Sequence, residues 1–181
     1  MAEKLGLRLF EAVGVELEYM IVEGGTLTVR PICDQLLSGL AGEITGDLEY
    51  PDISWSNELT LHVLEFKTTR PAGTLTRVAE YFQDHVARAN AALRPYGARL
   101  LPGAVHPWMD PYGEMVLWPH DNHEIYHAFN QIFDCRGHGW ANLQSLHLNL
   151  PFTGDEEFGK LHAAIRLLLP ILPALAASSP V

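Results

Sequence analysis

The sequence predicts an α+β fold in which an antiparallel-leaning sheet is covered by helices on one face. Three observations support this prediction. Segments that alternate apolar and polar residues, as half-buried strands do, occur early in the chain. The first of them are joined by hairpin-type turns, and helical spacing of three and four residues appears only later. Early hairpins followed by helices favour an antiparallel sheet.

The first strand is expected over residues 10–22, where apolar side chains alternate with Gly14, Glu16 and Glu18. Gly24 and Gly25 predict a hairpin turn that leads into a short returning strand over residues 26–31. The other expected elements follow in chain order: a weak helix over 31–42, a turn-rich segment over 46–56, a long strand over 58–68, a helix over 75–93, a strand over 98–101, a helix over 124–133, a strand over 143–150 and a last helix opened by a capping box at 153–156.

The 181 residues are 48% hydrophobic, enough for a single domain over 1–181 with a real core. A formal charge of −10 argues against non-specific binding to nucleic acid or to an anionic membrane. The apolar stretch 167–177 is too short for a bilayer span and is interrupted by Pro170 and Pro173. Cys33 and Cys135 form no C-x-x-C pair, so we expect free thiols in a cytoplasmic protein.

Glu16 and Glu18 have the same parity on the first strand, so both carboxylates leave one face of the sheet about 7 Å apart. Two such charges repel unless a cation or a basic group lies between them. A face that is simply solvated is the alternative interpretation.

Glu58 and Glu65 are seven positions apart, which gives them opposite parity on one regular strand. They share a site only if a bulge or a bent strand start intervenes. Apolar neighbours surround Glu65, and burying an unpaired carboxylate costs several kcal/mol, so a partner is expected. Lys67, at the same parity, is one candidate for that partner, and a metal ion is the other.

Ser145, His147 and Asn149 share one face of the strand predicted over 143–150. His147 on that polar face is a metal ligand, a general base or a surface histidine. Carboxylates with one imidazole suit Mg²⁺ or Mn²⁺. His123 and His127 have a zinc-like spacing on a predicted helix, but no Cys-rich set accompanies them. The chain also lacks the glycine-rich nucleotide loops and the Gly-x-Ser-x-Gly elbow.

Three segments taken in order resemble the glutamate–cysteine ligase and carboxylate–amine ligase family. Gly14-Val-Glu-Leu-Glu18 is similar to the family's first acidic strand, Glu58 to Thr68 to its second, and Ser145-Leu-His-Leu-Asn149 to its small-x-His-x-Asn strand. The similarity runs from about residue 10 to residue 180.

The resemblance implies half of a glutamine-synthetase-like catalytic domain that holds Mg²⁺ or Mn²⁺ around the phosphates of ATP. A substrate carboxylate, that of glutamate in the best-known members, is converted to an acyl phosphate, and an amine such as cysteine displaces the phosphate. By motif position the metal ligands are Glu16, Glu18, Glu58, Glu65 and His147, with Asn149 as a supporting polar group.

Family members run to roughly twice this length, so we expect the chain to be the N-terminal half of a catalytic domain and inactive alone. We also expect an apolar surface patch over residues 167–175, where self-association or a second half would cover it. Two alternatives stay open. One is a non-catalytic module or partner subunit that binds metal or nucleotide; the other is a metal-dependent hydrolase, for which the sequence offers no separate base or oxyanion device.

Overall fold

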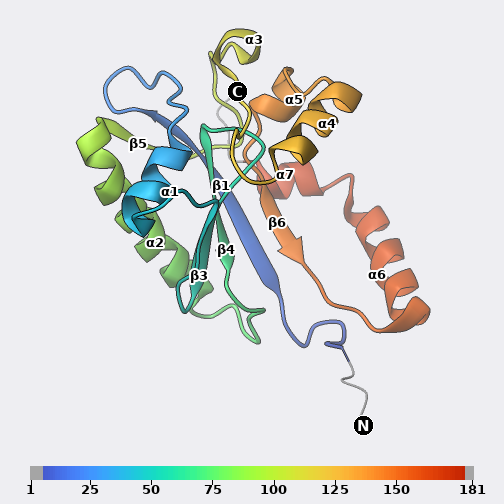
Figure 1. The fold of residues 1–181 in the computed structure, drawn as a ribbon. Coiled ribbons are helices and arrows are strands. Elements are labelled where there is room, and N and C mark those ends of the chain that lie inside the picture. Colours follow the sequence, from blue (N-terminus) through green and yellow to red (C-terminus); the bar gives the residue numbers. More distant parts are fainter. Residues whose placement is uncertain (1–5, 178–181) are drawn as a thin grey trace.

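The computed structural model describes residues 6–177, and the ends of the expected domain, 1–5 and 178–181, lie outside this range. Its centre is a six-stranded sheet in which every pair of neighbouring strands is antiparallel (Figure 1). The predicted α+β class is therefore confirmed. The strands are β1 Gly14–Glu23, β2 Asp47–Leu48, β3 Ile53–Asn57, β4 Val63–Thr68, β5 Ala98–Leu101 and β6 Leu146–Asn149.

Of the helices in the described residues, five lie between strands in the sequence, and two follow the last strand. They are α1 Cys33–Ala41, α2 Val78–Leu93, α3 Pro111–Glu114, α4 His123–Phe133, α5 His138–Ala141, α6 Gly154–Leu168 and α7 Leu172–Ala176, with a 3₁₀ turn at Arg94–Tyr96. Helices α1, α2 and α4 and strand β5 lie where the periodicity of the sequence predicts them.

Strand β1 is the central strand of the sheet. The strand order of the sheet is β2-β3-β4-β1-β5, and β6 also pairs with β1. Strand β4 pairs with one edge of β1. The other edge is shared by β6, which pairs with Gly14 to Leu17, and β5, which pairs with Met20 to Glu23. This arrangement places β4 and β6 on either side of the two glutamates of β1.

The two faces of the sheet differ. On one face Val15 and Ile21 of β1 join Trp55, Phe66 and the buried sides of α1 and α2 in the main core. On the other face the end of β1 packs against the 102–145 segment. Buried residues of both, with Val29, form a second cluster: Met20, Val22, Val29, Met109, Met115, Cys135 and Ala141. The first half of β1 has no such cover, and that is where Glu16 and Glu18 lie.

The expectation of one long strand over 58–68 is wrong. Strand β3 begins inside the segment expected to be turns and extends one residue beyond it, and β4 begins only at Val63. Residues 58–62 connect the two strands, and their backbone bonds to the 116–118 segment, with Leu61 N–H donating to Val116 O at 2.9 Å. The alternation Ile-Ser-Trp-Ser-Asn over 53–57 is a strand pattern, with Ile53 and Trp55 in the core.

Two smaller expectations also need correction. The returning strand over 26–31 is reduced to a single bridge between Val22 and Val29. The capping box at 153–156 does not form, because the Thr153 hydroxyl bonds to the carbonyls of residues 6 and 7. The carboxylate of Glu157, one position later, accepts the Thr153 N–H at 2.9 Å.

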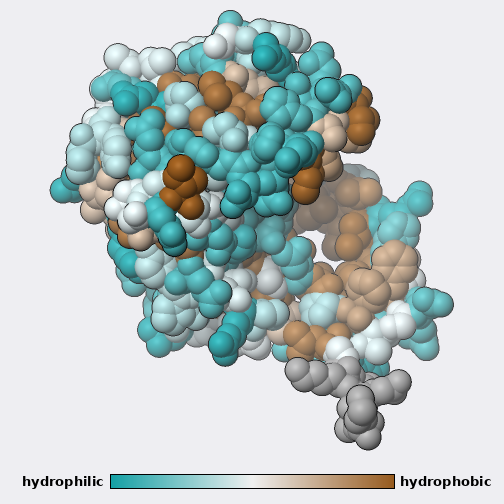
Figure 2. All heavy atoms as spheres, viewed as in Figure 1, coloured by the Kyte–Doolittle hydropathy of each residue, from teal (hydrophilic) through white to brown (hydrophobic). Residues whose placement is uncertain are grey.

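Helices α6 and α7 are peripheral, and none of their described residues is buried. Figure 1 shows α6 standing away from the sheet on the β6 side, and Figure 2 shows hydrophobic side chains around the hollow between them. The expected apolar surface is present, with Leu167 82% and Leu175 75% exposed. Among the described helices, none has both the length and the hydropathy that a bilayer crossing needs.

Candidate metal centre

Strand register brings the predicted site residues to one face of the sheet. Glu18 is opposite Glu65 and Glu16 is opposite Lys67 in the β1–β4 pair, while Glu16 is opposite His147 in the β1–β6 pair. Residues that are directly opposite in an antiparallel pair point to the same side. Three separate strands therefore present polar side chains to the uncovered half of this face.

The potential ligand atoms form two overlapping groups. One oxygen or nitrogen from each of Glu16, Glu65 and His147 lies within 4.8 Å of the others, and the same holds for Glu18, Glu58 and Glu65. Glu65 belongs to both groups, so the five side chains form one continuous cluster. The structure thus brings together all five residues that the sequence analysis named as ligands.

Glu58 reaches the cluster by a route that the sequence analysis did not foresee. It follows the end of β3 and precedes β4, so it does not share a strand with Glu65. The parity conflict between the two residues disappears because the chain crosses from one strand to the next between them. No bulge is needed.

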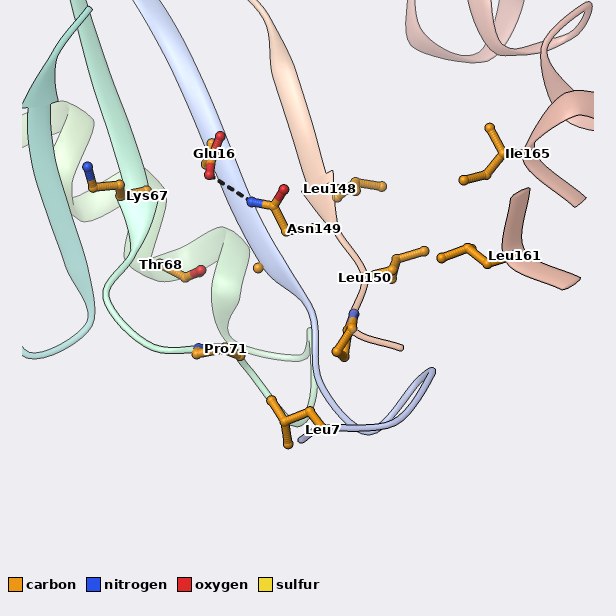
Figure 3. A pocket seen from close by; sticks show the side chains of 12 residues that line it. Leu7, Glu16, Lys67, Thr68, Pro71, Leu148, Asn149, Leu150, Leu161 and Ile165 are labelled. Carbon is orange, nitrogen blue, oxygen red and sulfur yellow. Dashed lines mark hydrogen bonds between the residues drawn. The ribbon is translucent and has the colours of Figure 1, made fainter. Parts of the chain in front are cut away.

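Hydrogen bonds hold three of these side chains in place. The Asn149 amide donates to Glu16 Oε1 at 2.7 Å (Figure 3), and His147 Nδ1 lies 2.9 Å from Glu16 Oε2. The Ser145 backbone N–H donates to Glu18 Oε2 at 2.8 Å. Asn149 therefore lies where a supporting polar group was predicted.

Lys67 is a basic partner of the cluster on the β4 side. Its ammonium is 3.5 Å from Glu65 Oε1 and 3.3 Å from Asp47 Oδ1, and it donates to the Ser56 hydroxyl at 2.9 Å. Ser56 in turn donates to Glu65 Oε1 at 2.8 Å. The salt bridge weighed as an alternative for Glu65 therefore exists. One ammonium shared with Asp47 still leaves the cluster's four carboxylates with an excess of negative charge.

The pKa values of the cluster reflect this excess. Burial, together with the charges of Glu65 and Glu18, raises the pKa of Glu58 to about 7. Burial also raises the pKa of Glu18, against the opposing effect of the Ser145 N–H. Partial burial disfavours the His147 imidazolium, but the bond to Glu16 and the surrounding carboxylates outweigh it and raise the pKa of His147. These groups therefore keep their protons to a higher pH than usual, and a bound divalent cation would replace those protons as the source of positive charge.

The chemistry of the donors fits a hard divalent cation. Four carboxylates and one imidazole match the preferences of Mg²⁺ and Mn²⁺. Both cysteines are buried in the two hydrophobic clusters, and neither belongs to the ligand groups found among the described residues. Lys67 and Ser56 complete the surroundings of Glu65.

The zinc-like spacing on α4 does not produce a site. Residues 123–127 carry the full His-Glu-x-x-His pattern, but the rings of His123 and His127 are 6.2 Å apart between centroids. Neither residue joins a group of three or more ligands among the described residues. The pattern lacks the third ligand that a zinc site requires.

Ser56 and the aromatic side chains of α4 and α5 lie next to the acids and were not among the site residues predicted from the sequence. A pocket opens there, lined partly by Tyr126, Phe129 and Trp140. The alternation of residues 53–57 is the signal for Ser56. The aromatic residues carry no such signal, because only the fold places α4 and α5 beside β1 and β6.

An antiparallel sheet that presents acids from adjacent strands on one face offers the ligand types that hard divalent cations prefer. The model of the glutamate-cysteine ligase family 2 (GCS2) matches residues 12–181, and the chain belongs to this family. The resemblance stated from the three motifs is therefore confirmed.

Two relatives align with most of the chain. It is 32% identical over 169 residues to an "Uncharacterized protein" of Archaeoglobus fulgidus, covering 93% of this chain and 45% of the relative. It is 27% identical over 172 residues to a "Putative glutamate--cysteine ligase 2-3" of Rubrobacter xylanophilus, covering 93% of this chain and 43% of the relative. The chain thus spans less than half the length of these relatives.

Proposed function

We propose that this chain supplies the cation-binding half of an ATP-dependent carboxylate–amine ligase of the glutamate–cysteine ligase type. The observation that carries the proposal is the convergence of Glu16, Glu18, Glu58, Glu65 and His147 on one face of the sheet. Membership of the glutamate–cysteine ligase family supports the same chemistry.

The proposed reaction has two steps. An oxygen of the substrate carboxylate, that of glutamate, attacks the γ-phosphorus of ATP, and ADP leaves. The nitrogen of the amine, cysteine in the simplest case, then attacks the acyl carbon; phosphate leaves and the nitrogen gives its proton to water. Mg²⁺ or Mn²⁺, when bound, offsets the negative charge on the phosphoryl group in transfer.

The residues of this chain have distinct tasks in this proposal. Glu65, only 7% exposed and shared by both ligand groups, sits at the middle of the centre. Asn149 orients the Glu16 carboxylate, and the Ser145 N–H orients that of Glu18. Lys67 limits repulsion at Glu65. We place the remaining phosphate-binding groups in the part of the relatives that this chain does not match.

Release of phosphate from ATP in the presence of glutamate, cysteine and Mg²⁺ tests the proposal. Residues 1–181 alone should show no turnover, and joining them to the unmatched part of a relative should restore it. Glu16→Gln and Glu65→Gln should then reduce turnover on the order of 10³-fold, as loss of electrostatic stabilisation does. Glu43→Gln, at an exposed position outside the cluster, is the matched control.

Each other outcome has a definite meaning. Robust turnover by residues 1–181 alone would show that the catalytic groups are misplaced in this proposal. Turnover of the completed protein that ignores both glutamine substitutions would remove the metal centre from the reaction. Cation binding with no ligation by the completed protein would favour the non-catalytic module instead.

A further inference from the structure

A second concave site adjoins the acids on the β1 C-terminal side. This pocket has a volume of about 510 Å³, within the range of small-molecule sites. Glu18, Glu58 and His147 belong to its lining, and the rest comes from α4, α5, the segment that leads into β6, and residues within 59–63. The pocket and the metal centre therefore share one wall.

The far wall of the pocket is apolar and aromatic. Ile125, Phe129, Trp140 and Leu143 line it and are 41–54% exposed. The Trp140 ring is held in position, because it stacks on Phe133 at 5.5 Å and meets Phe129 edge-on at 6.3 Å. Large apolar side chains that gather around a hollow are typical of binding sites.

The near wall carries the carboxyl groups of Glu18 and Glu58, whose pKa values are raised by burial and by neighbouring acids, and the His147 imidazole. Glu18 and Glu58 face the apolar wall across the pocket, and the described lining residues include no lysine or arginine. A ligand that suits both walls has an apolar body at one end and a cationic group at the other. An amine with an aromatic or large aliphatic body meets this description.

We propose that this pocket binds the amine substrate of the ligase, and that this amine carries an aromatic or large aliphatic body. The inference rests on the proposed function, which requires an amine to reach an acyl carbon held at the acids. A pocket that shares a wall with the acids seats the body of such an amine while its nitrogen points toward them. The side chain of cysteine would leave most of the apolar wall uncovered.

The adenosine part of ATP is the competing occupant, and it fits less well. It carries no positive charge to complement Glu18 and Glu58. Its hydrogen-bonding edge would meet Ile125, Phe129 and Leu143, which leaves polar groups without partners.

Calorimetric titration of the full chain with phenethylamine, without metal or ATP, tests the assignment. We expect saturable binding that is at least tenfold weaker for propylamine, which lacks the ring, for 3-phenylpropionate, which reverses the charge, and for cysteine. The assignment would be overturned if 3-phenylpropionate or propylamine bound as tightly as phenethylamine, or if adenosine bound more tightly than phenethylamine.

Variants locate the binding. Trp140→Ala should weaken phenethylamine binding at least tenfold, and Trp108→Ala, at a 61% exposed tryptophan outside the pocket, should leave it unchanged. Ile125→Lys adds a cation at a 54% exposed position of α4, where the fold tolerates it, and should weaken binding to a similar degree. Unchanged binding in both Trp140→Ala and Ile125→Lys would refute the pocket.

The outcome is separable from that of the ligase proposal. Phenethylamine binding in a chain that fails to bind Mn²⁺ would count against the metal centre and leave the pocket standing. Mn²⁺ binding without phenethylamine binding would overturn the pocket assignment alone.

Discussion

Glu65 links the two groups of ligands, and its surroundings explain how a carboxylate tolerates that position. It is 7% exposed, accepts the Ser56 hydroxyl and lies 3.5 Å from the Lys67 ammonium. Partners on the β3 and β4 side thus satisfy one oxygen, and the other acids approach from β1 and the β3–β4 connection. Such an arrangement stores repulsion that a divalent cation relieves.

Glu58 makes the stability of the metal-free chain depend on pH. Its pKa is raised from 4.5 to about 7 in the folded chain. Between these values the folded state holds a proton that the unfolded state has released, so the stabilisation is complete below about pH 4.5 and is lost as the pH rises through about 7. The raised pKa of His147 acts in the same direction.

We therefore expect the urea midpoint of the chain, measured with a chelator present, to fall between about pH 5 and about pH 7.5. Glu58→Gln keeps the shape of the side chain but does not ionise, so most of this fall should disappear. A fall of equal size in both proteins would show that other groups carry the pH dependence.

At the level of single residues the sequence predicted which side chains of β1 and β6 lie together in the acidic cluster. Parity on β1 put Glu16 and Glu18 together, and the alternation of residues 145–149 put His147 and Asn149 on one face. The position of Glu58 could not be predicted, because it depends on where β3 ends and β4 begins. That boundary is set by tertiary contacts of residues 59–61 with the 116–118 segment.

At the scale of elements, the β3–β4 hairpin links the site to the core. Its site face carries Ser56, Glu65 and Lys67, and its other face carries Trp55 and Phe66. The long helix α2 packs on that second face, and Trp55 Nε1–H donates to His85 Nδ1 of α2 at 2.7 Å. Both residues are buried, so this bond joins helix and sheet where water is excluded.

Trp55→Phe should lower the free energy of unfolding by about 1–3 kcal/mol or more, because it leaves the buried His85 nitrogen without its donor and removes packing volume. Chemical denaturation measures the change. Trp108→Phe, at an exposed tryptophan, should stay within about 0.5 kcal/mol of wild type. Equal losses in the two variants would mean that the Trp55–His85 bond does not hold α2 to the sheet.

Element types and element boundaries differ in how far the sequence predicts them. The spacing of apolar residues in α2 is regular over sixteen positions, and the helix is where it was expected. Strand β3 has only five residues and follows a segment rich in Gly, Pro and Asp, so turn signals hide its alternation. For short elements next to turn residues, packing against the core determines the type and the boundaries of the element.

At the scale of the whole molecule, the sheet is least covered at its β6 edge, where the leucines opposite Val15 and Leu17 are exposed on the face of the main core. The exposed apolar side chains concentrate at β6, α6 and α7, where Leu146 is 61% and Leu148 58% exposed. The groove between β6 and α6 is lined by Leu148, Leu161 and Ile165 together with Glu16 and Asn149 (Figure 3). The acidic cluster therefore borders the least covered part of the surface.

We expect the isolated chain to self-associate through this apolar surface, since exposed patches of this kind drive association. Light scattering should show an average mass above that of one chain that rises with concentration. Leu167→Glu combined with Leu175→Glu should lower it, because these are the most exposed leucines of α6 and α7. A monodisperse monomer at all concentrations would contradict the expectation.

The central claim is that five side chains from β1, β4, β6 and the β3–β4 connection form one divalent-cation centre. Titration of the chain with Mn²⁺, followed by the loss of the free-ion electron paramagnetic resonance signal, tests it most directly. We predict saturable binding that releases protons near pH 7, and a loss of at least tenfold in affinity for Glu65→Gln but not for Glu43→Gln. Equal binding by wild type and Glu65→Gln, or no saturable binding at all, would contradict the account.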